Sequence, residues 1–389
     1  MNQFGERIHH AKMYIPRMIR AGWGVLSAVL VCSSCTHSAS LSGTLQGVES
    51  DTLLVISSLI NESTNFRKDT VALVDHTFEL QYPDSALNIF IIAQPKSPNA
   101  PLRMPVGGPL VFLPGDKLHV EGSIDNFKIS GSELYDGIAS YKDIVRMQDE
   151  VHALNDAYSK AYAAKDELEK VRIKKEVKAV YDSLMTRKFE VVKSHPNTLV
   201  AAYFTTQLDA ERGLEALDLL PVEIKNGPMS GLIKRAQKSF ESRIIRESAK
   251  ANIQPGKMAP DFKLTTIKGK EISLSSFHGK YLLVDFWGTW CGWCIKGIPD
   301  MKKYYKKYHE HIEFLGVSCG DTDSKWRNGV KRYELPWVNV REGESNLAAR
   351  FAVDGYPTKV LLDSEGKIVE KFVGEGPELY ERLEQLFGE

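Results

Sequence analysis

The sequence has little cysteine, no excess charge of either sign and no long hydrophobic run. Five cysteines among 389 residues are too few to staple a disulfide-rich scaffold. Lysine plus arginine and aspartate plus glutamate balance at 50 each, so nothing in the charge calls for a nucleic-acid partner. The apolar stretch at residues 21–31 is too short to span a membrane stably. A hydrophobic content of 43% suits two or three domains with ordinary cores.

The N-terminus has the order of a secretory signal: basic residues, an apolar stretch, then small residues. We therefore predict that residues 1–34 are a signal peptide. Residues 30–35 resemble a loose bacterial lipoprotein box, which makes Cys35 the lipidated residue. The alternative is cleavage by ordinary signal peptidase with Cys35 left as a free thiol. Lipidation is favoured because a stray thiol is a liability in an oxidising compartment.

Two regions of different periodicity follow the signal. Residues 40–130 contain short β-like runs separated by Pro, Gly, Asn and Asp, which predicts an antiparallel, β-sandwich-like domain. Residues 131–250 have helical spacing of apolar residues and interleaved charges, which predicts a helical region with solvated faces. Neither region contains a catalytic constellation, and docking or dimerisation by the helices stays open.

Residues 281–299 organise the rest of the chain. An apolar run that contains one carboxylate, Asp285, predicts a strand covered on both faces. Cys291 and Cys294 follow where a helical pattern starts, and this spacing puts both sulfurs on one face of the first turn, close enough for a disulfide. Backbone N–H groups at a helix start favour a thiolate at Cys291. The stretch therefore predicts a redox centre.

The motif WGTWCGWC, together with Pro299 and residues 355–358, resembles the thioredoxin fold. Residues 259–262 and 279–284 are similar to its extracytoplasmic branch, the TlpA/ResA-like thiol–disulfide oxidoreductases, and the β domain resembles that of Bacteroidetes lipoproteins. The resemblance covers residues 254–389 and implies a C-terminal α/β thioredoxin-like domain. Alternating strands and helices there agree with a central sheet covered on both faces.

The cysteine positions and the resemblance assign catalytic roles. Cys291, nearest the helix start, is the predicted nucleophile, and Cys294 is the resolving thiol of the redox-active disulfide. Asp285 matches the buried thioredoxin aspartate and is predicted to exchange a proton as Cys294 attacks. The alternative for Asp285 is a purely structural carboxylate. Pro357 matches the thioredoxin cis-proline, next to the active cysteine.

Three residues are expected to meet the substrate. The resemblance implies that the Tyr356 backbone is open to pair with an extended substrate, and Trp290 and Trp293 are predicted to form an apolar rim. The sequence departs from its relatives at two positions. Gly297 stands where ResA-like proteins usually carry a glutamate, so a single carboxylate serving the centre has to be Asp285. Trp293 replaces the usual proline, which leaves the redox poise open.

The cysteines allow two other interpretations. Half of a zinc site would need further ligands, and no second Cys-x-x-Cys exists, so we expect neither a metal nor a cofactor. Cys319 ends a predicted strand at the edge where such folds place active sites. It is either a third redox thiol or, as we favour, a small buried apolar residue.

These features predict a lipid-anchored, extracytoplasmic thiol–disulfide oxidoreductase that reduces protein disulfides. Its partners would be disulfide-bearing extracytoplasmic proteins, a membrane thiol electron donor and, through the anchor, the membrane itself, but no nucleic acid. One alternative is a peroxiredoxin-like peroxidase, although its Pro-x-x-x-Thr-x-x-Cys motif is absent because Gly288 stands in place of the threonine. The other alternative is an envelope binding or scaffold protein with a vestigial redox centre.

Overall fold

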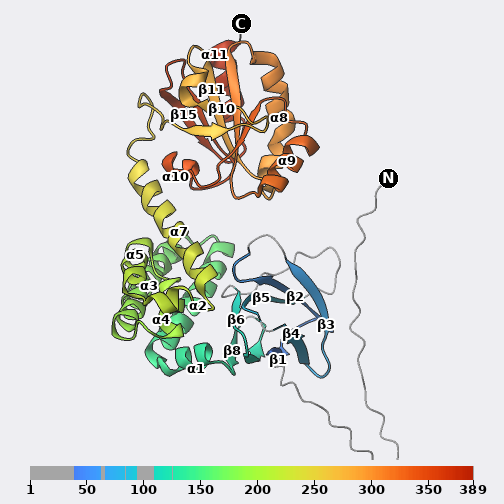
Figure 1. The fold of residues 1–389 in the computed structure, drawn as a ribbon, viewed down its shortest axis with the longest axis vertical. Helices are drawn as coiled ribbons and strands as arrows, with labels where there is room; N and C mark the ends of the chain where they lie inside the picture. The colour runs from blue at the N-terminus through green and yellow to red at the C-terminus, as the bar shows by residue number, and fades with distance from the viewer. Residues whose placement is uncertain (1–38, 63–65, 84, 94–108, 125, 389) are drawn as a thin grey trace, which may run out of the picture. The chain divides into compact units, whose positions relative to one another are not determined.

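The computed structural model describes residues 39–62, 66–83, 85–93, 109–124 and 126–388 (Figure 1). The predicted signal peptide and its lipidation site, Cys35, lie outside this part of the chain. Within it, none of the helices combines the length and apolar character that a membrane crossing requires.

The N-terminal strands form two four-stranded sheets (Figure 1). One has the order β4 (Thr77–Tyr82), β1 (Ala39–Gln46), β7 (Lys117–Ser123), β8 (Asn126–Ser130). The other has the order β3 (Arg67–Ala72), β2 (Thr52–Leu59), β5 (Leu87–Ala93), β6 (Leu110–Phe112). Burial alternates along β1, with Ala39, Leu41 and Leu45 inside, as expected for a strand with one solvated face.

The prediction of an antiparallel β domain needs one correction. Among the described strand pairs of this region, β1 and β7 run parallel, so their sheet is mixed, while the remaining pairs are antiparallel. The two parallel strands are separated by several other strands along the chain, and only such a long connection lets strands lie parallel. Local alternation does not reveal strand direction, which explains the error.

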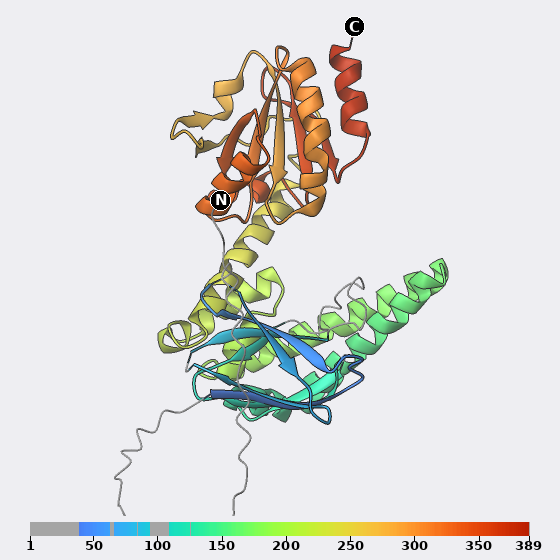
Figure 2. The same ribbon diagram turned by 90° about the vertical axis from the view of Figure 1, so that its right-hand side faces the viewer.

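Seven helices follow among the described residues: α1 (Glu133–Ser140), α2 (Lys142–Ala163), α3 (Glu167–Ser194), α4 (Leu199–Thr205), α5 (Ala210–Leu219), α6 (Val222–Lys225) and α7 (Ser230–Ala249). Side-chain oxygens of Ser132, Asp166, Thr198 and Asp209 cap the starts of α1, α3, α4 and α5. The long helices α2 and α3 run side by side (Figure 2). The helical region predicted from the apolar spacing is therefore present.

The C-terminal part is an α/β unit around a five-stranded sheet. Its strand order is β13 (Val338–Arg341), β12 (Ile312–Ser318), β11 (Tyr281–Trp287), β14 (Thr358–Leu362), β15 (Ile368–Val373). β13, β12 and β11 are parallel, whereas β14 and β15 are antiparallel to their neighbours. A separate hairpin pairs β9 (Lys263–Thr265) with β10 (Glu271–Ser273), followed by the 3-10 helix η1 (Leu274–Phe277). The helices are α8 (Gly292–Tyr308), α9 (Asp323–Arg332), α10 (Leu347–Arg350) and α11 (Glu378–Phe387).

Alternation along β11 divides its side chains between two cores. Leu282, Val284 and Phe286 belong to one cluster, and Leu283 belongs to another that contains side chains of α8 and α11. Because successive side chains of a strand point to opposite faces, Asp285 shares the face of Leu283. The sheet is therefore covered on both faces, as predicted, and the carboxylate faces the helix that begins at the cysteines.

Candidate active site

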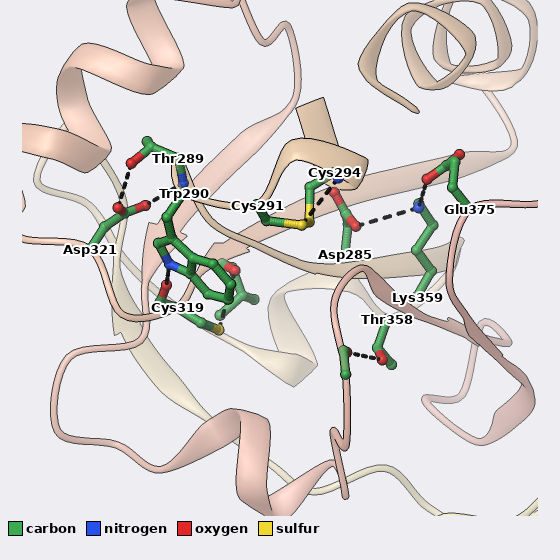
Figure 3. Close-up of a disulfide and its surroundings, with 12 residues drawn as sticks. Asp285, Thr289, Trp290, Cys291, Cys294, Cys319, Asp321, Thr358, Lys359 and Glu375 are labelled. Carbon is green, nitrogen blue, oxygen red and sulfur yellow. Dashed lines mark hydrogen bonds and ion pairs between the residues drawn. A yellow bond between two sulfur atoms is a disulfide. The ribbon is translucent and has the colours of Figure 1, made fainter. Parts of the chain in front are cut away.

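Cys291 and Cys294 form a disulfide at the start of α8, with Cα atoms 5.3 Å apart (Figure 3). Cys291 is the N-cap residue of the helix, and its sulfur accepts a hydrogen bond from the backbone N–H of Cys294 at 3.1 Å. Both residues are buried. A sulfur at this place lies in the field of unpaired N–H groups, which stabilises negative charge on it. The predicted order of a strand, the two cysteines and a helix is thus present in the structure.

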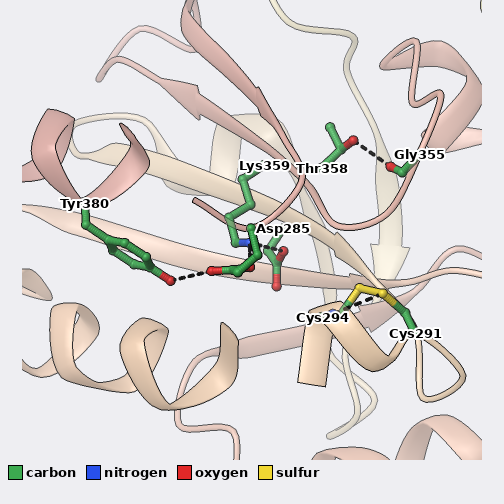
Figure 4. Close-up of polar contacts among 8 residues, drawn as sticks. Asp285, Cys291, Cys294, Gly355, Thr358, Lys359 and Tyr380 are labelled. Carbon is green, nitrogen blue, oxygen red and sulfur yellow. Dashed lines mark hydrogen bonds and ion pairs between the residues drawn. A yellow bond between two sulfur atoms is a disulfide. The ribbon is translucent and has the colours of Figure 1, made fainter. Parts of the chain in front are cut away.

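Asp285 lies on β11 behind the disulfide, and in both close-ups it is on the Cys294 side (Figures 3 and 4). Its side chain is 12% exposed, and Oδ1 has no hydrogen-bond partner among the described residues. Burial raises the pKa of Asp285 to about 6; the Lys359 ammonium opposes this rise and the Glu375 carboxylate adds to it. A buried carboxyl that titrates near neutral pH can both accept and donate a proton.

Lys359 and Glu375 belong to this site, although the sequence analysis did not single them out. Lys359 is paired directly opposite Asp285 between β11 and β14, and its Nζ lies 4.0 Å from Oδ1 of Asp285. The same ammonium donates to Oε2 of Glu375 at 2.7 Å. Tyr380 on α11 donates to the other Glu375 oxygen at 2.8 Å (Figure 4). A charged residue inside the apolar run of β14 was the available signal for Lys359.

The carboxylate of Glu375 occupies the space beside Gly297. A Cβ atom on Gly297 would lie 2.6 Å from Oε1 of Glu375 and closer still to Oε2. Such a separation is far inside van der Waals contact, so no side chain fits at position 297 while Glu375 stays in place. Besides Asp285, a second carboxylate, that of Glu375, therefore lies beside α8, one turn after Cys294.

The loop before the cysteines is fixed by Asp321. Its carboxylate accepts hydrogen bonds from the backbone N–H of Thr289 at 2.9 Å and from the Thr289 hydroxyl at 2.6 Å. The Ser318 hydroxyl donates to the same carboxylate at 2.7 Å. Asp321 is buried. These contacts join the end of β12 to the turn that presents Cys291 (Figure 3).

The predicted substrate-facing residues lie around this turn. Trp290 and Trp293 are exposed by 56% and 62%, while Trp287 is buried. The Trp290 indole donates to the carbonyl of Cys319 at 2.9 Å and packs edge-on against Tyr356, with ring centroids 5.1 Å apart. The Tyr356–Pro357 peptide bond is cis, as the resemblance implies.

Cys319 is a buried free thiol at the end of β12. Burial raises the pKa of this thiol, and its Sγ donates to the carbonyl of Val317 at 3.5 Å. A thiol with a raised pKa carries little thiolate, which is the reactive form. These observations favour the interpretation as a small buried apolar residue over that of a third redox thiol.

The arrangement combines a reducible sulfur pair, a buried proton-exchanging carboxyl and an exposed aromatic rim, which suits thiol–disulfide exchange. No group of three or more His, Cys, Asp or Glu side chains in the described ranges could hold a metal ion.

Comparison with known proteins places this site in a family. A sequence model of the AhpC/TSA family matches residues 255–371. The thiol-disulfide oxidoreductase ResA of Bacillus cereus is 37% identical over 127 residues, which are 32% of this chain and 73% of that protein. ResA of Bacillus subtilis is 33% identical over 128 residues, which are 33% of this chain and 72% of that protein. A crystal structure of the thioredoxin domain of a thiol-disulfide oxidoreductase from Bacteroides vulgatus has 31% identity and a TM-score of 0.32, covering 34% of this chain and 97% of that chain.

Both ResA proteins bear the name of a thiol–disulfide oxidoreductase, so the comparison does not favour the peroxidase alternative. The match covers most of each ResA protein, and the AhpC/TSA model matches the part of this chain that carries the Cys291–Cys294 disulfide. The chain therefore belongs to the ResA-like thiol–disulfide oxidoreductases of the thioredoxin superfamily.

Proposed function

We propose that this protein reduces disulfides of extracytoplasmic proteins through Cys291 and Cys294. The observation that carries the proposal is the disulfide at the N-terminus of α8 with the buried carboxyl of Asp285 on its Cys294 side. Together they supply a sulfur that is stabilised as a thiolate and a group that removes the proton from its partner.

The exchange proceeds in two steps. The Cys291 thiolate attacks one sulfur of the substrate disulfide, which forms a mixed disulfide and releases the first substrate thiolate. Asp285 then accepts the proton of Cys294, and the resulting thiolate attacks Sγ of Cys291 and releases the second substrate thiolate. The two released thiolates take up protons, so the substrate gains two electrons and two protons and the protein dithiol becomes a disulfide.

The rim around the cysteines is the proposed docking surface for the substrate. The exposed rings of Trp290 and Trp293 offer apolar area, and the backbone of Tyr356, next to Pro357, would pair with an extended substrate segment. Main-chain pairing recognises extended peptides of varied sequence, because it uses groups that every residue carries. Unfolded or flexible disulfide-bearing proteins fit this surface.

The residues between and behind the cysteines favour reduction over oxidation. Strong oxidants of this fold keep a histidine between their cysteines and reach thiolate pKa values of about 3.5 and potentials of about −120 mV. Gly292 and Trp293 stand there in this chain and donate no charge-assisted bond to the Cys291 sulfur. An ionised Asp285 opposes a nearby thiolate. We infer a potential nearer the roughly −270 mV of thioredoxin, with electrons supplied by a membrane thiol donor.

The location belongs to the same proposal. The signal-like N-terminus and the lipoprotein-like residues before Cys35 support a protein held by a lipid anchor on the extracytoplasmic side of a membrane. A compartment of that kind is oxidising, which is why a reductase there needs a donor that passes electrons across the membrane.

Equilibration of the full chain with glutathione or dithiothreitol buffers tests the direction, and insulin-disulfide reduction tests the activity. We expect insulin to be reduced and the potential to lie well below roughly −180 mV, the value for disulfide isomerases. A higher potential would overturn the reductase assignment. Absent insulin reduction would support the scaffold alternative, and rapid peroxide consumption would support the peroxidase.

A further inference from the structure

Behind Cys294, the structure places two buried charged groups, Asp285 and Lys359, in a row with a third that is largely buried, Glu375. Lys359 is 3% exposed, Glu375 14% and Asp285 12%. Burial of an unpaired ammonium is costly, so Lys359 is held by its two carboxylates. The separations are unequal: 2.7 Å to Glu375 but 4.0 Å to Asp285. Glu375 therefore holds the ammonium more closely than Asp285 does.

The position of the Glu375 carboxylate is fixed by its neighbours. Tyr380 and Lys359 each donate to one of its oxygens, and Gly297 leaves the space in which the carboxylate lies. The carboxylate beside this turn of α8 comes from the segment between β15 and α11.

We propose that Lys359 and Glu375 are positioning residues that act on Asp285: the ammonium, shared between two carboxylates, sets how readily Asp285 takes the proton of Cys294. This inference rests on the role proposed above for Asp285. Lys359 favours ionised Asp285, and Glu375 disfavours it, both directly and by drawing the ammonium away. The two residues thus have opposite effects on the same proton.

The other groups around Asp285 do not duplicate this arrangement. β12 presents Gly316 opposite Asp285, without a side chain. Cys319 from the end of β12 and Tyr380 from α11 sense the charge of Asp285, and burial raises the pKa of each. Both are therefore neutral at pH 7. Among the described residues, Lys359 and Glu375 are the two groups whose charges shift the pKa of Asp285.

The test follows Asp285 in the oxidised full chain, where neither Cys291 nor Cys294 titrates. The carboxyl carbon signal of Asp285 in an Asp-labelled protein is assigned by its loss in Asp285→Asn, and its NMR titration midpoint is measured. We expect a midpoint near the pKa of about 6 in the parent protein. It should rise by about one pH unit in Lys359→Met and fall by about one unit in Glu375→Gln.

Matched controls separate this effect from general loss of structure. Lys367 and Glu365 form an exposed ion pair at 2.6 Å near the start of β15, so Lys367→Met and Glu365→Gln should leave the midpoint unchanged. Glu375→Gln keeps the shape of the side chain, and its downward shift supports the proposal even where Lys359→Met does not fold. Opposite shifts support the proposal; an unchanged midpoint in Glu375→Gln, or shifts of the same sign, would overturn it.

The exchange rate then tests whether the Lys359–Glu375–Asp285 relay, in which the first two residues set how readily Asp285 takes a proton, affects the chemical step. The low-pH limb of the pH–rate profile, measured for exchange with oxidised glutathione, should move with the titration midpoint of Asp285. It should move to higher pH in Lys359→Met and to lower pH in Glu375→Gln. If Asp285→Asn exchanges at the parent rate, the role proposed for Asp285 fails and the relay with it. If Asp285→Asn is slow but the limb moves in neither variant, the relay alone fails.

Discussion

At the residue scale, the two cysteines differ in what surrounds them. The Cys291 sulfur caps α8, whereas Cys294 lies one turn inside and faces the buried carboxyl of Asp285 (Figure 3). The helix terminus stabilises charge on the first sulfur. The role proposed for the carboxyl is to accept the proton of the second. The structure thus supports different tasks for two residues of the same type.

Single cysteine variants test this division. Cys291→Ser should abolish exchange, because no stabilised thiolate remains at the helix start. Cys294→Ser should accumulate mixed disulfides, because nothing resolves them. Mass spectrometry of trapped complexes should find the substrate on Cys291, and a substrate attached to Cys294 in the Cys291→Ser variant would reverse the assignment.

The raised pKa of Asp285 also predicts how stability depends on pH. Its pKa rises from 3.8 to about 6 on folding, so the folded state binds the proton more tightly and loses stability as pH rises from about 4 to about 6. Asp285→Asn should therefore raise the free energy of unfolding at pH 7 by about 3 kcal/mol, from the roughly 1.4 kcal/mol that each pKa unit represents.

Tryptophan fluorescence during denaturant unfolding measures this effect, because five of the six tryptophans follow residue 280. The difference between the parent protein and Asp285→Asn should shrink as pH falls from about 6 to about 4 and vanish below that, where the carboxyl is protonated in both states. A difference that stays constant from pH 4 to pH 7 would argue against ionisation as its cause.

At the element scale, the site depends on contacts between the ends of strands and the loops that follow them. Asp321, which follows β12, holds the turn after β11. Glu375, which follows β15, holds the Lys359 ammonium on β14. These loops meet because the strands lie next to one another in the sheet. The order of the strands in the sheet therefore determines where the turn that presents Cys291 lies.

Asp321→Ala should weaken both the fold and the exchange. It leaves the Thr289 N–H, the Thr289 hydroxyl and the Ser318 hydroxyl without their acceptor, at a cost of about 3 kcal/mol. The Cys291 turn loses its support, so exchange with oxidised glutathione should slow even where the protein stays folded. Asp323→Ala is the matched control, because that carboxylate is 56% exposed and should matter by less than about 1 kcal/mol.

At the scale of the whole molecule, redox chemistry belongs to the C-terminal α/β unit, and the N-terminal sheets and helices carry no comparable cluster among their described residues. The two N-terminal sheets and the helices α1 to α7 share one hydrophobic core, which includes Leu41, Phe112 and Phe204. The boundaries of the predicted domains at residues 40–130, 131–250 and 254–389 remain predictions.

The predicted anchor is tested on the whole protein in cells. Cys35→Ala should move the protein from the membrane to the soluble extracytoplasmic fraction, because it removes the residue to which the acyl chains would be attached. A single acyl chain binds a membrane only marginally, so a lipoprotein depends on several chains attached to that one residue. Cys319→Ala, which changes a buried thiol, is the control and should stay at the membrane. A Cys35→Ala protein that remains in the membrane fraction would contradict lipid anchoring.

Much of the C-terminal fold could be predicted because its signals are local. The apolar run that contains Asp285 predicts the strand that the structure shows as β11, and the cysteine spacing places the disulfide at a helix start. The strands β1, β8, β9 and the edge strand β13 were not predicted from the sequence. β13 has only four residues, Val338–Arg341, too few to establish a pattern.

The amino-acid sequence alone therefore determined the redox pair, the carboxylate in the preceding strand and the family, since each depends on residues close together in the chain. Only the tertiary structure decided which groups act on that carboxylate. Lys359 meets Asp285 through the register of β11 and β14, and Glu375 meets Lys359 through the course of the chain after β15. Neither is fixed by local spacing, because strand register and loop closure depend on packing of the whole domain.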